Sequence, residues 1–237
     1  MVPKDLLNNL NPEQKTAVLH SGGPLLILAG AGSGKTRVIT VKIAYLIREL
    51  GVDPRSILAV TFTNKAAGEM RDRAAGMVDS AEDVMIRTFH SFGAWLLRRN
   101  HDAADLDRNY TIYDDDDVVS LLRTLYPDEN RGYLGGYARM ISRAKDYCLT
   151  PGDDLTRVNP DPEFAEMYRK YQKRLNEIGN VDFGDLILRP VTLLQSNLEI
   201  RARIRQRFRY ILVDEYQDSN VAQYELLKQL AAPDTYV

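Results

Sequence analysis

The sequence predicts an α/β fold in which helices flank a parallel sheet and an all-helical segment is inserted into it. Three observations predict this fold. Residues 25–28 form a short apolar run that leads into a glycine-rich turn and an amphipathic helix. Further β-rich runs at 56–63 and 84–88 are each followed by a helical pattern, so strands and helices alternate. Between 114 and 179 the pattern is helical throughout.

The elements follow from local patterns, taken in chain order. Asn11 as N-cap, Pro12 at the first helical position and Gln14 in a capping-box position predict a helix that ends near His20. The continuous apolar run at 25–28 suits a strand buried on both faces of a parallel sheet. Helices are expected over residues 35–50, 65–77 and 89–99, and strand character returns at 210–213.

The helical pattern of residues 114–179 indicates a segment inserted between two parts of the sheet domain. We therefore predict one domain from residues 1–107 and 181–237 and a helical insertion at 108–180, broken at the glycines of 132–136 and in the loop 150–162. Four acids at 114–117 could bind a cation, but their placement at a helix N-terminus is the favoured explanation. The alternating arginines of 201–209 predict a basic helix with a solvated face rather than a track for DNA.

Length and composition exclude several classes of protein. The chain has 237 residues, 44% of them hydrophobic and 27% charged, which is enough to bury a core and too apolar for a disordered tail. The net charge of −2 points neither to nucleic acid nor to a membrane surface. The single cysteine, Cys148, permits no intramolecular disulfide and no thiolate zinc site. With neither a secretory signal nor a membrane-length apolar run, we expect a cytoplasmic protein without membrane contact.

Residues 29–36 have the pattern of a phosphate-binding loop, with alanine at the first glycine position. Small residues let backbone N–H groups converge on phosphate oxygens, and the following helix N-terminus adds positive potential. We expect Lys35 to reach the β and γ phosphates and Thr36 to bind Mg²⁺. The alternative is a turn that only connects strand to helix. The loop residues are Ala29, Gly30, Ala31, Gly32, Ser33, Gly34, Lys35 and Thr36.

A phosphate-binding loop needs a carboxylate site at the end of another strand, and residues 210–213 are followed by one. We expect Asp214 to hold Mg²⁺ through water and Glu215 to polarise the attacking water. An acidic pair that opens a helix is the alternative. The long separation of Lys35 from Asp214 favours a motor-type ATPase with an accessory domain, using ATP and Mg²⁺, over a compact nucleotide kinase.

Five segments in order resemble the UvrD/Rep/PcrA family of superfamily 1 DNA helicases: residues 10–14, 29–37, 61–67, 88–91 and 214–218. The resemblance spans nearly the whole chain. It implies the first RecA-like P-loop NTPase domain of an enzyme that moves 3′ to 5′ on single-stranded DNA, meets duplex junctions, and acts in DNA repair or replication. A second RecA-like domain with arginine fingers would follow in such a protein, so we expect this chain alone to hydrolyse ATP slowly and not to unwind DNA.

The resemblance also implies further site residues. Gln14 would read the adenine and Arg37 would lie beside the adenine or the phosphates; the alternatives are a capping side chain and an exposed charge. Gln217 would couple the nucleotide site to the DNA site, and joins Lys35 and Glu215 as an expected catalytic residue. The implied DNA contacts are Phe62, Thr63, Asn64, Thr88 and His90.

Some of these assignments have structural alternatives. An aromatic at a strand end such as Phe62 is more often core, and a lone histidine such as His90 is more often structural. Residues 181–186 resemble a further family motif, Asp-Phe-Asp-Asp-Leu, with Gly184 in place of the central acid. For Asp182 we favour a helix N-cap.

Two other functions stay open at this point. The chain could be the motor half of a helicase-nuclease subunit, or a short ATP-gated DNA-binding module without motor activity. The coding sequence beyond Val237 discriminates between them, because a nuclease motif would reveal the first and a stop codon the second.

Overall fold

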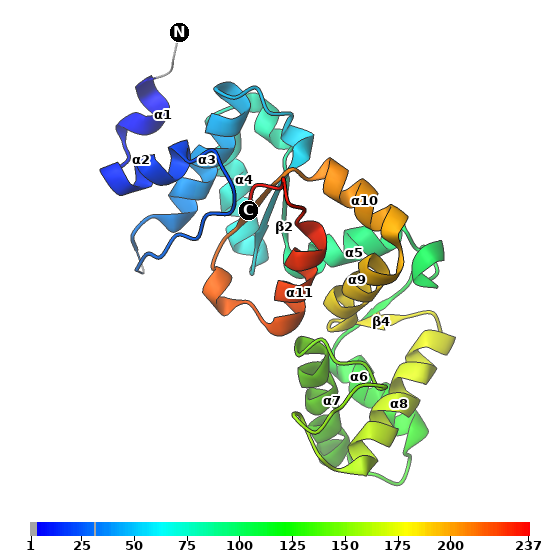
Figure 1. Ribbon diagram of the computed structural model, residues 1–237. Helices are drawn as coiled ribbons and strands as arrows, with labels where there is room; N and C mark the ends of the chain where they lie inside the picture. The colour runs from blue at the N-terminus through cyan, green and yellow to red at the C-terminus, as the bar shows by residue number, and fades with distance from the viewer. Residues whose placement is uncertain (1–3, 31) are drawn as a thin grey trace. The chain divides into compact units, whose positions relative to one another are not determined.

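The computed structural model describes residues 4–30 and 32–237 (Figure 1). The chain divides into two units, which we describe separately. The sheet unit comprises Met1–Phe89, Glu199–Asp218 and Leu230–Val237, and the helical unit comprises His90–Leu198 and Ser219–Gln229. The predicted insertion at 108–180 lies inside the helical unit; the predicted domain boundaries themselves stay a prediction. Among the described residues, no helix is long and apolar enough to cross a membrane.

A three-stranded parallel sheet forms the centre of the sheet unit, as the predicted fold class requires. Strand β1 (Ile57–Thr61) lies between β2 (Met85–Thr88) and β5 (Tyr210–Val213). In this register Ala59 lies opposite both Ile86 and Leu212. All of β1 is buried, because a central strand of a parallel sheet is covered on both faces.

Helices pack on this sheet through an apolar core that includes Ile43, Leu46, Met70 and Ile86. The helices of the sheet unit are α1 (Lys4–Asn8), α2 (Pro12–Leu19), α3 (Lys35–Arg48) and α4 (Asn64–Ala75), with 3₁₀ turns η1 (Pro54–Ser56), η2 (Asp79–Asp83) and η4 (Tyr216–Asp218). The capping box predicted for α2 is present: the Asn11 side chain accepts from the Gln14 N–H, and the Gln14 side chain accepts from the Asn11 N–H.

The strand predicted at residues 25–28 is not formed. This segment has no regular secondary structure, and the exposed fractions of Leu26 and Leu28 are 64% and 88%. A continuous apolar run becomes a buried strand only where neighbouring strands pair with its backbone on both sides. In the described chain, the backbone of residues 25–28 makes one hydrogen bond to the segment beside the sheet, from the Leu25 N–H to the Val237 carbonyl (2.8 Å).

The helical unit contains six α-helices among the described residues and a short parallel pair of strands. The helices are α5 (Phe89–Arg99), α6 (Asp115–Leu125), α7 (Arg131–Asp146), α8 (Pro162–Glu177), α9 (Asp185–Ser196) and α11 (Val221–Leu230), with the 3₁₀ turn η3 (Asp102–Ala104). Strand β3 (Ile112–Tyr113) pairs with β4 (Val181–Asp182). Along the chain, α10 (Leu198–Arg207) precedes β5 and confirms the helix predicted in the arginine-rich segment.

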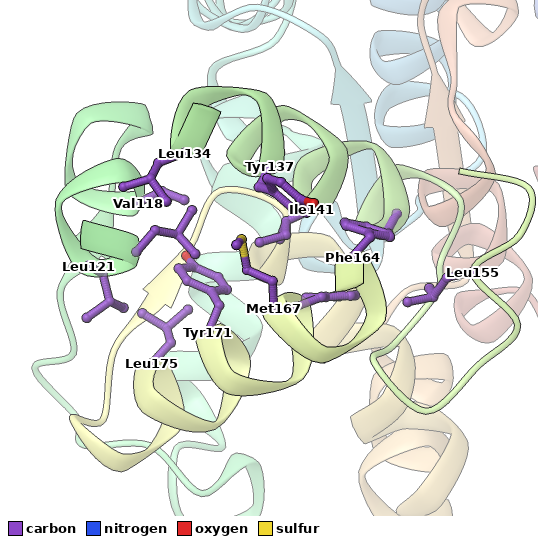
Figure 2. Close-up of a cluster of buried hydrophobic side chains, with 13 residues drawn as sticks. Val118, Leu121, Leu134, Tyr137, Ile141, Leu155, Phe164, Met167, Tyr171 and Leu175 are labelled. Atoms are coloured by element: carbon purple, nitrogen blue, oxygen red, sulfur yellow. The ribbon is translucent and has the colours of Figure 1, made fainter. Parts of the chain in front are cut away.

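Helices α6, α7 and α8 enclose a core of their own (Figure 2). Leu134 and Ile141 of α7 face Phe164 and Tyr171 of α8 within this cluster. The predicted break at 132–136 is wrong, because α7 runs through these glycines. Each glycine costs a helix roughly 1 kcal/mol, and the Asn130 N-cap together with the buried apolar stripe outweighs that cost.

The predicted role of the acids at 114–117 is confirmed. Asp114 is the N-cap of α6, where its side chain accepts from the Asp117 N–H (2.9 Å), and the Asp117 side chain accepts from the Asp114 N–H in return. Carboxylates are favourable at the positive end of a helix, so this acidic run stabilises α6.

Candidate functional site

The glycine-rich loop before α3 lines a cavity of about 800 Å³ in the sheet unit. Gly32 and Gly34 have φ values of +74° and +86°, in the left-handed region that glycine adopts at low cost. A Cβ at Gly34 would also lie 3.0 Å from Nε2 of Gln14. The loop residues that line the cavity are Ala29, Gly30, Gly32, Ser33, Gly34, Lys35 and Thr36. Ala31 lies outside the described residues.

The structure places this loop next to the acidic pair that follows β5. The Thr36 hydroxyl donates to Oδ2 of Asp214 (3.0 Å), although the two residues are far apart in the chain. The Lys35 ammonium lies 3.9 Å from Oε2 of Glu215 and donates to the Ala29 carbonyl (3.2 Å). The two predicted halves of a phosphate and metal site therefore contact each other, and Glu215 lines the cavity together with the loop.

Asp214 is buried, with an exposed fraction of 3%. This burial raises the pKa of the Asp214 carboxyl above its ordinary value, and the hydrogen bond from Thr36 opposes the rise. The Glu215 N–H donates to Oδ1 of the same carboxylate (3.1 Å). Each oxygen of the Asp214 carboxylate therefore accepts one hydrogen bond, Oδ2 from Thr36 and Oδ1 from the Glu215 N–H.

Glu215 has a left-handed backbone, with φ of +54°, which is costly for a residue with a Cβ. Its carbonyl accepts from the Asp218 N–H (2.9 Å), and its carboxylate accepts from the Gln217 side chain. Both Glu215 and Gln217 line the cavity. The predicted catalytic residues Lys35, Glu215 and Gln217 thus form one chain of polar contacts.

Gln14 contacts the loop through its side-chain amide. Its Nε2 donates to the Ser33 carbonyl (2.8 Å), while its Oε1 accepts from the Asn11 N–H (3.0 Å). The amide proposed to read the base is therefore the same group that closes the capping box. Arg37, on the first turn of α3, also lines the cavity.

Arg73 of α4 lines the same cavity, and sequence reasoning missed it. Its guanidinium lies 3.4 Å from the carboxylate of Glu69, one turn earlier on the exposed face of α4. Nothing in the local sequence distinguishes Arg73 from other surface arginines, so only the fold could have found it.

The residues expected to contact DNA in the sheet unit lie after β1 and at the end of β2. Phe62 is half-buried, and its ring packs edge-on against Phe89 at 5.5 Å between centroids. Thr63 is the N-cap of α4 and accepts from the Ala66 N–H (3.1 Å), while the neighbouring Asn64 is exposed. Thr88 is buried.

His90 belongs to the helical unit, where its ring lies 5.3 Å from that of Phe183. The Phe183 ring is 55% exposed. Burial lowers the pKa of His90, so its imidazole is neutral near pH 7. The motif that contains Phe183 was identified from the sequence, but a role was assigned only to Asp182 within it. The aromatic that directly follows Asp182 in this motif was the signal available.

Asp182 makes the capping bond that the sequence suggests: its Oδ1 accepts from the Asp185 N–H (2.9 Å), and its own N–H donates to Oδ2 of Asp185 (3.4 Å). The regular turns of α9 begin at Asp185, after Gly184. Asp182 is buried, and its Oδ2 accepts from the Lys145 ammonium (2.6 Å) and from the Tyr171 hydroxyl (2.9 Å). Lys145 also lies 2.8 Å from Oδ1 of Asp185 and has no exposed side-chain surface. A buried carboxylate needs a countercharge, which a remote lysine supplies here.

A parallel sheet with a glycine-rich loop at a helix N-terminus, and an acidic pair at the end of a sheet strand, defines the phosphate-loop class of nucleotide-binding proteins. Residues 10–237 match the model of the UvrD/REP helicase N-terminal domain, and the chain belongs to this family.

Similar proteins carry helicase names. The chain is 43% identical, over 98% of its length, to the ATP-dependent DNA helicase PcrA of Leuconostoc citreum. It is 44% identical, over 97% of its length, to the ATP-dependent DNA helicase UvrD1 of Mycobacterium tuberculosis, and 42% identical, over 96%, to PcrA of Staphylococcus aureus. It spans 31% to 32% of the length of these relatives.

Proposed function

We propose that this chain is the ATP-binding first motor domain of a DNA helicase that moves 3′ to 5′ on single-stranded DNA in repair or replication. The observation that carries the proposal is the contact of the loop with the acidic pair: Thr36 bonds Asp214, and Lys35 lies beside Glu215 in the lining of one cavity. Membership of the UvrD/REP family and the names of the relatives support it.

The cavity fits the triphosphate of ATP by the chemistry of its lining. Lys35, Arg37 and Arg73 supply positive charge, and the left-handed glycines leave the loop backbone free of side chains that would block phosphate oxygens. Lys35 would exchange its bonds to Ala29 and Glu215 for bonds to phosphate.

A magnesium ion would be held by Thr36 and, directly or through water, by Asp214. Among the residues that the structure describes, no three His, Cys, Asp or Glu side chains gather into a metal site. Mg²⁺ commonly binds through one or two protein oxygens, phosphates and water, which agrees with this sparse donor set. When bound, the ion would neutralise charge on the phosphates.

Glu215 would polarise the water that attacks the γ phosphate. Its strained backbone holds the carboxylate within reach of both Lys35 and Gln217. Gln217 would report the state of this site to bound DNA, because it contacts the carboxylate directly. Phe62, Thr63, Asn64 and Thr88 would contact single-stranded DNA from the sheet unit.

His90 and Phe183 would contact single-stranded DNA from the helical unit, where Phe183 is the exposed ring of the pair. Aromatic stacking on bases needs no strong positive field. The net charge of −2 is therefore compatible with this kind of binding.

Binding of ATP with Mg²⁺ to the purified chain tests the proposal. The wild-type chain is expected to bind weakly, and Lys35→Ala is expected to abolish binding, because it removes the ammonium from the loop. The matched control is Lys173→Ala, at a lysine of the helical unit whose side chain is 78% exposed. Equal binding by Lys35→Ala and the control would show that the loop only connects two elements.

A further inference from the structure

Helix α2, which carries Gln14, is short and shallowly packed. It has eight residues, of which Val18 alone is fully buried within the described helix. An isolated helix of this length is not stable in water, so its position depends on a few specific contacts. One of them is the bond from Gln14 Nε2 to the Ser33 carbonyl, at the N-terminal end.

The C-terminal end of α2 is held by a buried ammonium group. Lys42 of α3 is 3% exposed, and its Nζ donates to the carbonyls of Val18 (2.8 Å) and His20. The last carbonyls of a helix have no partner within the helix, and a cation there also interacts favourably with the helix dipole. The Tyr236 ring lies 4.6 Å from the same Nζ and shields it from water.

A lysine in this position is costly, since burial lowers the pKa of Lys42 to about 8. The neighbouring core is apolar and includes Leu10, Val18, Val38 and Val41. A methionine would fill the same space without the cost of burying a charge, but it would leave two carbonyls without their donor. Lysine differs from methionine here because its ammonium group donates hydrogen bonds to the carbonyls at the end of α2.

We propose that Lys42 is a positioning residue for recognition of the nucleotide base. By holding the C-terminal end of α2 against α3, it places the Gln14 amide beside the phosphate-binding loop. This inference rests on the proposed function, in which Gln14 reads the adenine. Because Lys35 and Lys42 lie on the same helix, α3 carries both the lysine of the phosphate-binding loop and the lysine that holds α2.

The test compares two probes on the full 237-residue chain, each with Mg²⁺, by isothermal titration calorimetry. ATP needs both the base and phosphate sites, whereas inorganic tripolyphosphate needs the loop alone. Lys42→Met is expected to weaken ATP binding about tenfold, through loss of a charge-assisted contact that orders α2. Tripolyphosphate affinity should stay within about twofold, and Lys42→Arg should restore most of the ATP affinity.

Three controls separate this role from a general structural one. Lys173→Met, at an exposed site, should change neither affinity. In a Gln14→Ala background, Lys42→Met should weaken ATP binding no further, because Lys42 acts through Gln14. If Lys42→Met does not fold by circular dichroism, Lys42→Gln keeps two N–H donors and should lower ATP affinity about threefold with tripolyphosphate unchanged.

Two results would overturn the inference: unchanged ATP affinity in a folded Lys42→Met chain, or an equal loss for both probes. Failure of the wild-type chain to bind either probe would be a different result. It would refute the proposed function, and the role of Lys42 with it.

Discussion

At the scale of single residues, Asp214 illustrates how a buried carboxylate weakens the fold that holds it. Burial raises its pKa above the ordinary value of 3.8, so the folded chain binds this proton more tightly than the unfolded chain. As pH rises from the unfolded pKa through the raised folded pKa, the chain therefore loses stability at this position.

Asp214→Asn should consequently stabilise the ligand-free chain near pH 7 while abolishing magnesium-dependent ATP binding. Thermal unfolding between pH 3.5 and 7 checks this, and the difference in melting temperature should shrink toward the acid end, where Asp214 is protonated. Asp128→Asn, at an exposed position, is the control. A difference that does not vary with pH would show that ionisation of Asp214 is not the cause.

Lys145 carries the second prediction at this scale. Burial and the neighbouring Asp182 raise the pKa of Asp185, and Lys145 compensates both carboxylates. Lys145→Met should cost about 3–5 kcal/mol of unfolding free energy, because it leaves buried charge without a partner. Denaturant unfolding measures this, with the exposed Lys173→Met as control.

Adding Asp182→Asn and Asp185→Asn to Lys145→Met should recover much of the lost stability. A loss below about 1 kcal/mol for Lys145→Met alone would contradict the electrostatic account of this cluster.

Sequence reasoning succeeds for residues whose partners are close in the chain and fails where they are remote. The Asn11 and Asp114 caps were predictable because each cap bonds a residue three positions on. The bond from the Asp185 N–H to Asp182 follows the same rule, whereas the pairing of Asp182 with Lys145, 37 positions away, could not be predicted. Arg73 reaches the cavity only through the packing of α4, which no local pattern reveals.

At the scale of elements, helices were easier to predict than strands, because a strand depends on partners that are remote in the chain. A helix satisfies its own backbone, so the amphipathic patterns of α6 and α8 were sufficient to predict them. A strand depends on neighbours supplied by other parts of the chain. The apolar pattern of residues 25–28 therefore predicted an element that the described chain does not form.

The contact between α5 and α9 gives a prediction at this scale. A Cβ at Gly93 would lie 1.7 Å from the Leu186 carbonyl oxygen and 2.9 Å from its carbon, so the two backbones touch. Gly93→Ala must force these helices apart and should cost about 3 kcal/mol in denaturant unfolding.

The matched control is Gly68→Ala in α4, where a Cβ would meet nothing within 4 Å. Alanine is the better helix former, so this variant should gain roughly 0.5–1 kcal/mol. If Gly93→Ala is as stable as Gly68→Ala, α5 and α9 are not in backbone contact in solution.

At the scale of the whole molecule, the chain spans about a third of the length of its relatives. Its cavity is lined by the loop and by Glu215, whereas the family resemblance assigns the arginine fingers to a second domain. Such arginines contribute a factor of about 10³–10⁵ to phosphoryl transfer. We therefore expect weak ATP binding, very slow hydrolysis and no unwinding by this chain.

Phosphate release with and without single-stranded DNA, together with strand displacement on a tailed duplex, measures these activities. Lys35→Ala prepared in parallel identifies any contaminating ATPase. Robust turnover stimulated by DNA in the wild-type chain alone would contradict the expectation, and would show that the described cavity is catalytically sufficient.

Residues 26–28 also bear on how the purified chain behaves at high concentration. Three adjacent apolar side chains, Leu26, Ile27 and Leu28, are exposed on a segment that belongs to no sheet. Such a segment is a template onto which a second molecule can add a strand. Because Ile27 and Leu28 also line the cavity of the phosphate-binding loop, we expect occupation of that cavity to lower the tendency of the chain to associate at high concentration.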